Sequence, residues 1–127
     1  MAILPLDHGI FASSGASSDG AAYFGGGETT AGRVNAVDKF AFSDDSRTTL
    51  VATLSVARDY LAGAANSGVA GYFAGGYSSL GNHDTVDKIA FSDDSRSTLG
   101  TGLSASRRAL AGAANSGTAA YFAGGYE

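Results

Sequence analysis

The chain has 127 residues, of which 16 % are charged, with a formal net charge of −4 and a pI of about 4.9. This length fits one ordinary domain, and eight scattered Lys and Arg residues in an acidic chain argue against nucleic acid or an anionic membrane surface as a partner. The absence of cysteine excludes disulfides and Cys-based metal sites, and since no run approaches the ~20 apolar residues of a spanning helix, membrane insertion is not expected.

Large apolar residues are scarce. Leu, Ile, Val and Phe together supply 25 of the 127 residues, whereas glycine alone supplies 19. So low a share approaches that of disordered chains, but disorder is also associated with a higher net charge than −4. The composition therefore favours a thin-layered, glycine-rich β structure with small interior residues.

The predicted elements begin in an N-terminal segment, residues 1–22, where residues 8–12 form a degenerate first strand. A second strand follows at residues 21–27. From Tyr23 onward the chain repeats itself: residues 23–71 and 72–120 align without a gap and 29 of 49 positions are identical. Residues 121–127 begin a third copy. A fixed period of this size is typical of repeat architectures.

Each unit alternates short apolar runs with turn-rich clusters, which is the pattern of strands rather than helices. The second unit is expected to contain four strands, at residues 61–65, 69–74, 86–91 and about 97–103. A tight turn at 66–68 and a turn at 92–95 join them in pairs, and a polar loop at 77–85 joins the pairs. The sequence therefore predicts an all-β protein made of four-stranded antiparallel sheets.

The order of these features resembles the kelch repeat, a unit of about 50 residues that forms one blade of a β-propeller. The matching features are the glycine pair after the second strand, as in Gly75-Gly76, and an arginine before the first strand, Arg58 or Arg107. Phe42 and Phe91 stand near the place where a kelch unit usually has Trp. The resemblance covers residues 8–126 and implies about 2.5 blades in the chain.

The resemblance also suggests a setting. The nearly identical units, rich in Ala, Gly and Ser, are similar to low-diversity kelch-like repeats encoded by marine phages, which implies a virion or extracellular location. In kelch-like blades an arginine at this place commonly ties neighbouring blades together, so the resemblance implies a blade–blade role for Arg58 and Arg107.

A second resemblance concerns the turn between the third and fourth strands. Residues 92–99, Ser-Asp-Asp-Ser-Arg-Ser-Thr-Leu, are similar to the structural Asp-box of sialidase-type propellers, and residues 43–50 repeat them. We expect Asp45 and Asp94 to accept backbone N–H groups in these turns. The aspartate pairs at 44–45 and 93–94 also suit Ca²⁺, but no EF-hand spacing is present and an arginine follows each pair, so turn capping is the favoured interpretation. Asn66 and Asn115 are expected to shape the tight turns between first and second strands.

About 2.5 blades are too few for a propeller, which uses ~4–8. We therefore expect a homo-oligomer that closes a ring, a homopolymer in which half-blades of successive subunits complete each other's sheets, or a chain that is part of a longer protein. An unpaired strand edge invites such pairing between molecules.

No residue pattern predicts catalysis, a cofactor or a metal site. The two histidines, His8 and His83, have no counterpart in the repeats, so solvated loop residues are the default interpretation. The phosphate-binding loop and the nucleophile elbow are both missing from the sequence. A sialidase-like propeller hydrolase is the enzymatic alternative. That chemistry needs clustered arginines with acidic and tyrosine partners, which eight scattered basic residues supply poorly.

The two units differ mainly in the loops between second and third strands and between fourth and first strands, which emerge at one end of an antiparallel blade. Either neutral drift in loops or a binding face explains this pattern. The candidate contacts of such a loop face are Tyr77, Leu80, Asn82, His83, Asp84 and Arg108. The sequence thus suggests a non-enzymatic structural or adhesive subunit, such as a phage tail-fibre or extracellular surface component, that binds a glycan or a surface protein through this face.

Overall fold

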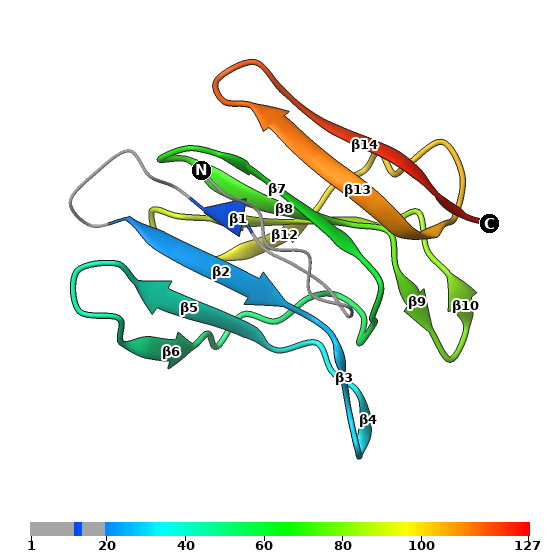
Figure 1. Cartoon of the computed structure of the whole chain (residues 1–127), viewed down its shortest axis with the longest axis horizontal. Coiled ribbons are helices and arrows are strands. Elements are labelled where there is room, and N and C mark those ends of the chain that lie inside the picture. Colours follow the sequence, from blue (N-terminus) through cyan, green and yellow to red (C-terminus); the bar gives the residue numbers. More distant parts are fainter. Residues whose placement is uncertain (1–11, 14–19) are drawn as a thin grey trace.

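The described residues, 12–13 and 20–127 of a computed structural model, form strands and no helix (Figure 1). A four-stranded antiparallel sheet of order β1-β2-β5-β6, the first sheet, contains β1 (Ala12–Ser13), β2 (Ala21–Gly25), β5 (Val37–Ala41) and β6 (Arg47–Thr49). The second sheet, of order β7-β8-β11-β12, contains β7 (Ala62–Asn66), β8 (Ala70–Ala74), β11 (Val86–Ala90) and β12 (Arg96–Thr98).

Three two-stranded hairpins complete the described fold. The C-terminal hairpin consists of β13 (Arg108–Asn115) and β14 (Ala119–Tyr126). Two small hairpins connect second and third strands: β3 (Glu28–Thr29) with β4 (Gly32–Arg33), and β9 (Tyr77–Ser78) with β10 (Gly81–Asn82). In Figure 1 the first sheet, the second sheet and the C-terminal hairpin lie in three successive layers, and both small hairpins lie at the same end.

The all-β prediction and the four-stranded antiparallel sheets are confirmed. Two details were wrong. The loop expected at 77–85 contains the β9–β10 hairpin, and the fourth strand is only Arg96–Thr98 rather than about 97–103. The first strand expected at residues 8–12 lies almost wholly outside the described residues, which begin with Ala12 and Ser13.

The short fourth strand has a physical reason. The backbone N–H of Leu99 donates to the carbonyl of Val86, but that of Leu103 donates to the carbonyl of Asp84. Between these two hydrogen bonds the donor segment advances by four residues, whereas the acceptor segment moves back by only two. Residues 100–102 therefore cannot continue the pairing of β12 with β11. Gly102 permits this path, because a Cβ there would lie 2.7 Å from the Asp84 carbonyl oxygen.

The strand pairing repeats with the period of the sequence. Tyr23 pairs with Lys39 between β2 and β5, and Tyr72 pairs with Lys88 between β8 and β11. Ala113 pairs with Tyr121 in the C-terminal hairpin, as Ala64 pairs with Tyr72 in the second sheet. Each 49-residue step in the sequence therefore corresponds to one step from layer to layer.

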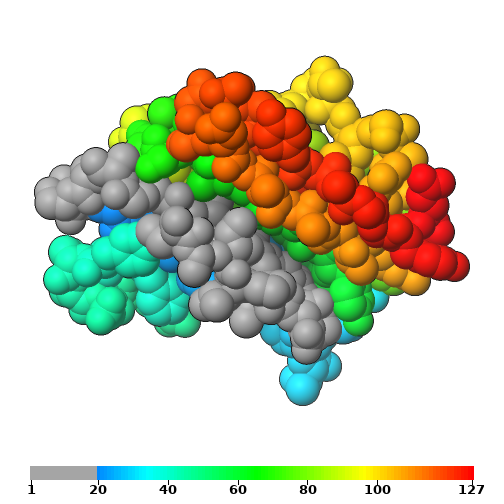
Figure 2. Space-filling view, turned by 45° about the horizontal axis from the view of Figure 1, so that its top comes forward, coloured from blue at the N-terminus to red at the C-terminus, as the bar shows by residue number. Residues whose placement is uncertain are grey.

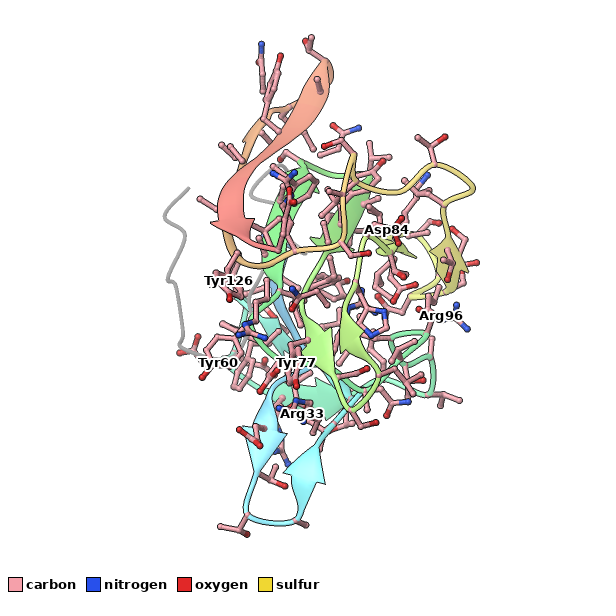
Figure 3. The ribbon with its side chains drawn as sticks, turned by 90° about the vertical axis from the view of Figure 1, so that its right-hand side faces the viewer. Arg33, Tyr60, Tyr77, Asp84, Arg96 and Tyr126 are labelled. Atoms are coloured by element: carbon pink, nitrogen blue, oxygen red, sulfur yellow. The ribbon has the colours of Figure 1, made fainter. Side chains whose placement is uncertain are left out.

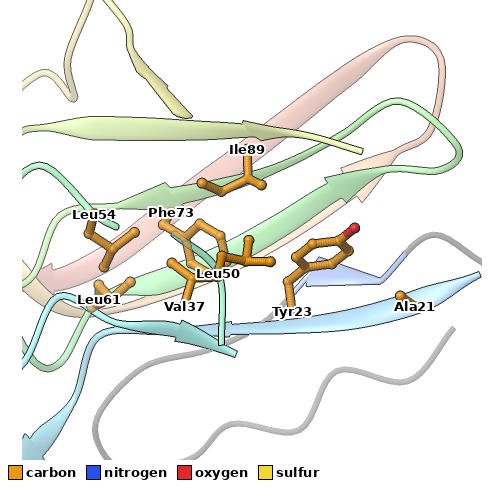
Figure 4. Close-up of a cluster of buried hydrophobic side chains, with 8 residues drawn as sticks. All are labelled: Ala21, Tyr23, Val37, Leu50, Leu54, Leu61, Phe73 and Ile89. Carbon is orange, nitrogen blue, oxygen red and sulfur yellow. The ribbon is translucent and has the colours of Figure 1, made fainter. Parts of the chain in front are cut away.

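The core lies between the first and second sheets (Figure 4). It consists of buried side chains from both sides of the interface: Ala21, Tyr23, Val37, Leu50, Leu54, Leu61, Phe73 and Ile89, with Phe91 packed against them. The rings of Tyr23 and Phe91 stack with centroids 4.7 Å apart. Apolar burial across this interface is the main stabilising contact of the fold.

The glycine pairs after the second strands allow the layers to approach closely. Gly26 and Gly75 have φ of +74° and +67°, and a Cβ there would lie 2.5 Å from the Arg58 carbonyl oxygen and 2.7 Å from that of Arg107. Only a residue without a side chain combines a left-handed backbone with such close approach. This contact explains the first glycine of the pair in the two complete units, whereas a Cβ at Gly124, its counterpart in the third copy, would meet nothing within 4 Å.

Candidate functional site

A ladder of alternating arginine and tyrosine side chains runs across the end of the molecule that carries the small hairpins. The Arg33 guanidinium lies 4.6 Å from the centre of the Tyr77 ring, and the Arg108 guanidinium lies 4.6 Å from the same ring and 5.0 Å from that of Tyr126. These residues come from β4, β9, β13 and β14, so three repeats contribute to one ladder. Figure 3 shows Arg33, Tyr77 and Tyr126 in succession at this end.

A buried carboxylate, that of Asp59, holds Arg33 of the ladder in place. Arg33 Nε donates to Asp59 Oδ1 at 3.0 Å, and Asp59 is fully buried. The hydrogen bond to Asp59 raises the pKa of Arg33 because it stabilises the charged form. The backbones of Asp59 and Tyr77 also exchange two hydrogen bonds, of 2.8 and 3.0 Å. Tyr77 is thereby held between two guanidinium groups, an arrangement suited to stacking and to donating hydrogen bonds to an anionic or hydroxyl-rich ligand.

The structure brings three of the six predicted loop-face residues together. Tyr77 and Arg108 are part of the ladder, and Arg108 donates to Asn82 Oδ1 at 3.3 Å. Asn82 Nδ2 in turn donates to the Tyr126 carbonyl at 3.3 Å. Leu80 is exposed, as one of the two residues that join β9 to β10.

His83 and Asp84 lie apart from the ladder. His83 Nε2 is 2.7 Å from the Ser78 hydroxyl, and burial, followed by the charge of Arg58, lowers the pKa of the imidazole. The exposed Asp84 offers its carbonyl to Leu103, and Figure 3 shows its side chain away from Tyr77. The predicted loop face is therefore two groups rather than one.

Sequence reasoning missed Arg33, Asp59 and Tyr126 as parts of the ladder. Tyr126 stands one period after Tyr77 and could have been found from the repeat. Arg33 and Asp59 align with Asn82 and Arg108, in the same segments that differ between the units. The difference between units therefore pointed to them as well, but the candidates were taken from one unit only.

A second polar site joins the two four-stranded sheets. The Tyr23 hydroxyl donates to Asp94 Oδ1 at 2.8 Å, and Lys39 Nζ donates to Asp94 Oδ2 at 2.8 Å. Tyr23 and Lys39 belong to the first sheet, whereas Asp94 is in the turn before β12. This cluster ties the sheets together at the edge of the core.

These contacts correct the predicted roles of the turn aspartates. The backbone acceptors are Asp44 and Asp93, which receive the N–H groups of Ser46 and Ser95 at 3.0 and 3.1 Å. Asp45 and Asp94 adopt a φ of 57° instead, and the carboxylate of Asp94 reaches the neighbouring sheet. An aspartate in a turn accepts from the N–H group two residues later in the chain. The N–H groups that point into these turns are those of Ser46 and Ser95, so the acceptor is the first aspartate of each pair.

The other two predicted turn residues occupy turns. Asn66 and Asn115 accept backbone hydrogen bonds from Val69 and Thr118, each at 2.9 Å. Asn66 Oδ1 also accepts from the Gly117 N–H at 2.8 Å. Asn66 therefore links the turn of the second sheet to that of the C-terminal hairpin.

The buried Tyr23 makes the free energy of unfolding depend on pH in the alkaline range. Burial, and then the hydrogen bond to Asp94, raises the pKa of Tyr23 to about 12, whereas an unfolded tyrosine has a pKa of about 10. The folded chain keeps a proton that the unfolded chain loses, so this contribution is complete below about pH 10 and is lost as the pH rises to about 12. We expect Tyr23→Phe to flatten the fall in unfolding free energy over this range in urea titrations.

A buried ion pair lies where the chain passes from the first sheet to the second. Arg58 NH1 donates to Asp87 Oδ2 at 3.0 Å and Arg58 NH2 to the Phe73 carbonyl at 3.1 Å, and both charged side chains are fully buried. The backbone of Arg58 meanwhile accepts from Gly27 N–H at 2.9 Å. Arg58 thus contacts both sheets.

Asp87 has further donors. Ser55 gives its N–H and its hydroxyl at 2.8 and 2.9 Å, and Thr98 gives its hydroxyl at 2.6 Å. Burial by itself would raise the pKa of Asp87, but these hydrogen bonds and the charge of Arg58 hold it below its usual value. The network is therefore built around an ionised carboxylate.

Arg107, one period after Arg58, has no such partner. Its guanidinium donates to the Gly124 carbonyl at 3.2 Å and to the exposed Glu127 carboxylate at 3.2 Å. Its Nε is buried without a hydrogen-bond partner among the described residues, as is that of Arg58, so the two positions differ in the missing aspartate. The position predicted to link blades is thus only partly satisfied within one chain.

Residues 12–13 and 20–127 hold no group of three or more metal-ligating His, Asp or Glu side chains and no helix capable of spanning a membrane. His8 lies outside the described residues. No model of a known protein family and no curated protein matches this chain.

Proposed function

We propose that this chain is a non-enzymatic structural subunit that assembles with copies of itself, its four-stranded sheets acting as kelch-like propeller blades. It would serve in a phage tail fibre or an extracellular surface structure. One observation carries the proposal: residues that form the interface between the first and second sheets recur on a face of the second sheet that is only partly covered.

The two faces differ in burial although their residues match. Leu50 in the closed interface is 8 % exposed, whereas its counterpart Leu99 is 38 % exposed. Leu54 is buried, and its counterpart Leu103 is half-buried. A repeated interface with one apolar side left open favours association.

Mass in solution tests the proposal. Light scattering and sedimentation over a wide range of protein concentration should show species at multiples of 12.6 kDa, and electron micrographs should show rings or filaments. A mass of one chain at every concentration would contradict self-assembly. Turnover in a glycosidase screen would contradict the non-enzymatic assignment.

The Arg–Tyr ladder favours a second role, the binding of a glycan or a surface protein. Its stacked rings and guanidinium groups lie at one end of the molecule, as a binding face requires. The double variant Tyr77→Ala with Arg108→Ala should lose binding on a glycan array while keeping its circular dichroism spectrum. Equal binding by both proteins would remove this role and leave assembly in place.

A further inference from the structure

We propose that the C-terminal hairpin of one copy replaces β1 and β2 in the first sheet of a second copy, so that β14 pairs with β5 of the second copy. This inference rests on the proposed function, since it specifies the contact through which copies assemble. The repeat, the open groove and two sets of incomplete charge contacts support it.

The sequence of β2 recurs one and two periods later, in β8 and in β14. Residues 119–125, Ala-Ala-Tyr-Phe-Ala-Gly-Gly, repeat residues 21–27, Ala-Ala-Tyr-Phe-Gly-Gly-Gly, with one difference. β2 pairs with β5 through Tyr23 and Lys39. The outer edge of β14 has no partner strand among the described residues. β14 therefore has the sequence and the free edge needed to pair with β5.

The exchange gives β5 a neighbour of nearly identical sequence. Within the described residues β1 and β2 share two paired positions, and β13 and β14 share seven. Exchange of equivalent elements between copies is a low-cost route to assembly because it conserves the contacts.

An open groove lies between the second sheet and the C-terminal hairpin. It has a volume of about 340 Å³ and is lined by side chains that include Tyr72, Leu99, Leu103 and Phe122. In the closed interface Ile89 and Phe91 of the third strand occupy the corresponding space beside Tyr23 and Leu50. The groove is therefore open where the closed interface is filled by two side chains from the third-strand region of the neighbouring sheet.

β5 and the residue that follows it offer suitable side chains. Phe40, in β5, and Phe42, directly after it, stand one period before Ile89 and Phe91, and they are 36 % and 46 % exposed. With β5 of a second copy paired to β14, these two side chains enter the groove. Phe42 of that copy then meets Tyr72 as Phe91 meets Tyr23. In Figure 2 both the β5–β6 end of the first sheet and the C-terminal hairpin lie at the surface.

The charges match in the same way. Asp38, one period before Asp87, is bonded to the Thr49 hydroxyl and forms no ion pair within the described residues. Arg107, one period after Arg58, has an exposed glutamate in place of a buried aspartate. When β14 pairs with β5 of a second copy, Arg107 lies beside Asp38 of that copy. The two can then form an ion pair like that of Arg58 with Asp87.

A second charge contact is completed by the same exchange. Lys88 lies 5.9 Å from the centre of the Tyr72 ring, as Lys39 lies 5.5 Å from that of Tyr23, but within the described residues no carboxylate joins Lys88. Asp45 has the φ of 57° that Asp94 has, and no hydrogen bond to its carboxylate occurs within the described part of the chain. After the exchange, the carboxylate of Asp45 of the second copy would accept hydrogen bonds from the Tyr72 hydroxyl and from Lys88 Nζ.

Engineered disulfides test the exchange, since the chain has no cysteine of its own. Ala21 pairs with Ala41 within one chain, and the proposal pairs Ala119 with Ala41 of another copy. Paired residues of antiparallel strands have Cα atoms about 4.5–5.5 Å apart, within reach of a disulfide. The variant Ala119→Cys with Ala41→Cys should form disulfide-linked dimers and longer chains on oxidation. Ala21→Cys with Ala41→Cys, the matched control, should close within single unexchanged chains.

Charge reversal gives a second, independent test. Asp38→Arg alone and Arg107→Asp alone should each weaken association at least tenfold in sedimentation, because every contact then joins like charges. An equimolar mixture of the two variants should associate again, since each copy then meets an opposite charge. Circular dichroism of each variant checks that it folds.

The outcomes separate this inference from the proposed function. The wild-type chain could form oligomers while the variant with Ala119→Cys and Ala41→Cys forms no disulfide between copies and charge reversal leaves association unchanged. That result would overturn the exchange but leave self-assembly standing. A disulfide-linked dimer of the single variant Ala119→Cys would indicate contact between two β14 strands and would also overturn it. A wild-type chain that stays monomeric would overturn both.

Discussion

Replacing Asp87 by alanine should lower the free energy of unfolding by about 3–5 kcal/mol, the usual effect of removing one partner of a buried ion pair. The substitution leaves the fully buried Arg58 guanidinium without its 3.0 Å counter-charge. Ser55 loses its acceptor as well. Urea unfolding followed by circular dichroism measures the loss.

Asp38→Ala is the matched control, because Asp38 occupies the same repeat position without a buried arginine beside it. It gives up the hydrogen bond from Thr49, for which we expect about 0.5–1.5 kcal/mol. The comparison requires protein concentrations at which the chain is a single copy. Equal losses at the two positions would contradict a special role for the ion pair.

Acid should weaken the same network. The lowered pKa of Asp87 means that its contribution is present above the unfolded value of about 3.9 and is lost as the pH falls through the folded value. A weaker acid-induced fall is expected for Asp87→Asn in urea titrations below pH 5. An unchanged acid profile would show that other carboxylates set the acid limit.

Phe73→Ala should also cost about 3–5 kcal/mol, since it removes a large side chain from a packed interior. Phe73 is fully buried between the first and second sheets, and its ring lies against Gly25, where a Cβ would come within 3.1 Å of it. Neighbouring backbones joined in two sheets cannot move in to fill the space, so a cavity would remain. Thermal and urea unfolding both report the change.

Phe122→Ala is the control for this second substitution. Phe122 occupies the same repeat position but lines the open groove and is half-buried. In a single copy we expect the loss to be about 1–2 kcal/mol, because solvent already reaches the site. If the two substitutions were equally costly, the groove beside the C-terminal hairpin would have to be as well packed as the central core.

The sequence was sufficient to predict the repeat, the all-β class and most strands, because apolar runs and turn residues are local signals. It could not predict the length of the fourth strand. The runs at 48–54 and 97–103 look continuous, but backbone hydrogen bonds of Leu99 and Leu103 skip residues 100–102. Likewise, two adjacent aspartates are chemically equivalent in the sequence, and only the left-handed φ of Asp94 directs its carboxylate to the next sheet.

The candidate ladder was predictable only in part. Tyr77 and Arg108 lie in segments that differ between the units, which is why they were candidates. Arg33 reaches Tyr77 because one layer stacks on the next, and this proximity depends on the spacing between layers rather than on any pattern within a unit. The contacts of Asp94 with Tyr23 and Lys39 were missed for the same reason.

The constant 49-residue step in strand pairing has an evolutionary consequence. Unequal recombination between the two units would insert or delete a whole unit, and every new junction would keep the contacts made by the residues that the units share. In nearest-neighbour energetics each added unit contributes its own intrinsic and junction terms. A lineage carrying this gene could therefore change the length of its product in single mutational events, with only the contacts of the variable loops made anew.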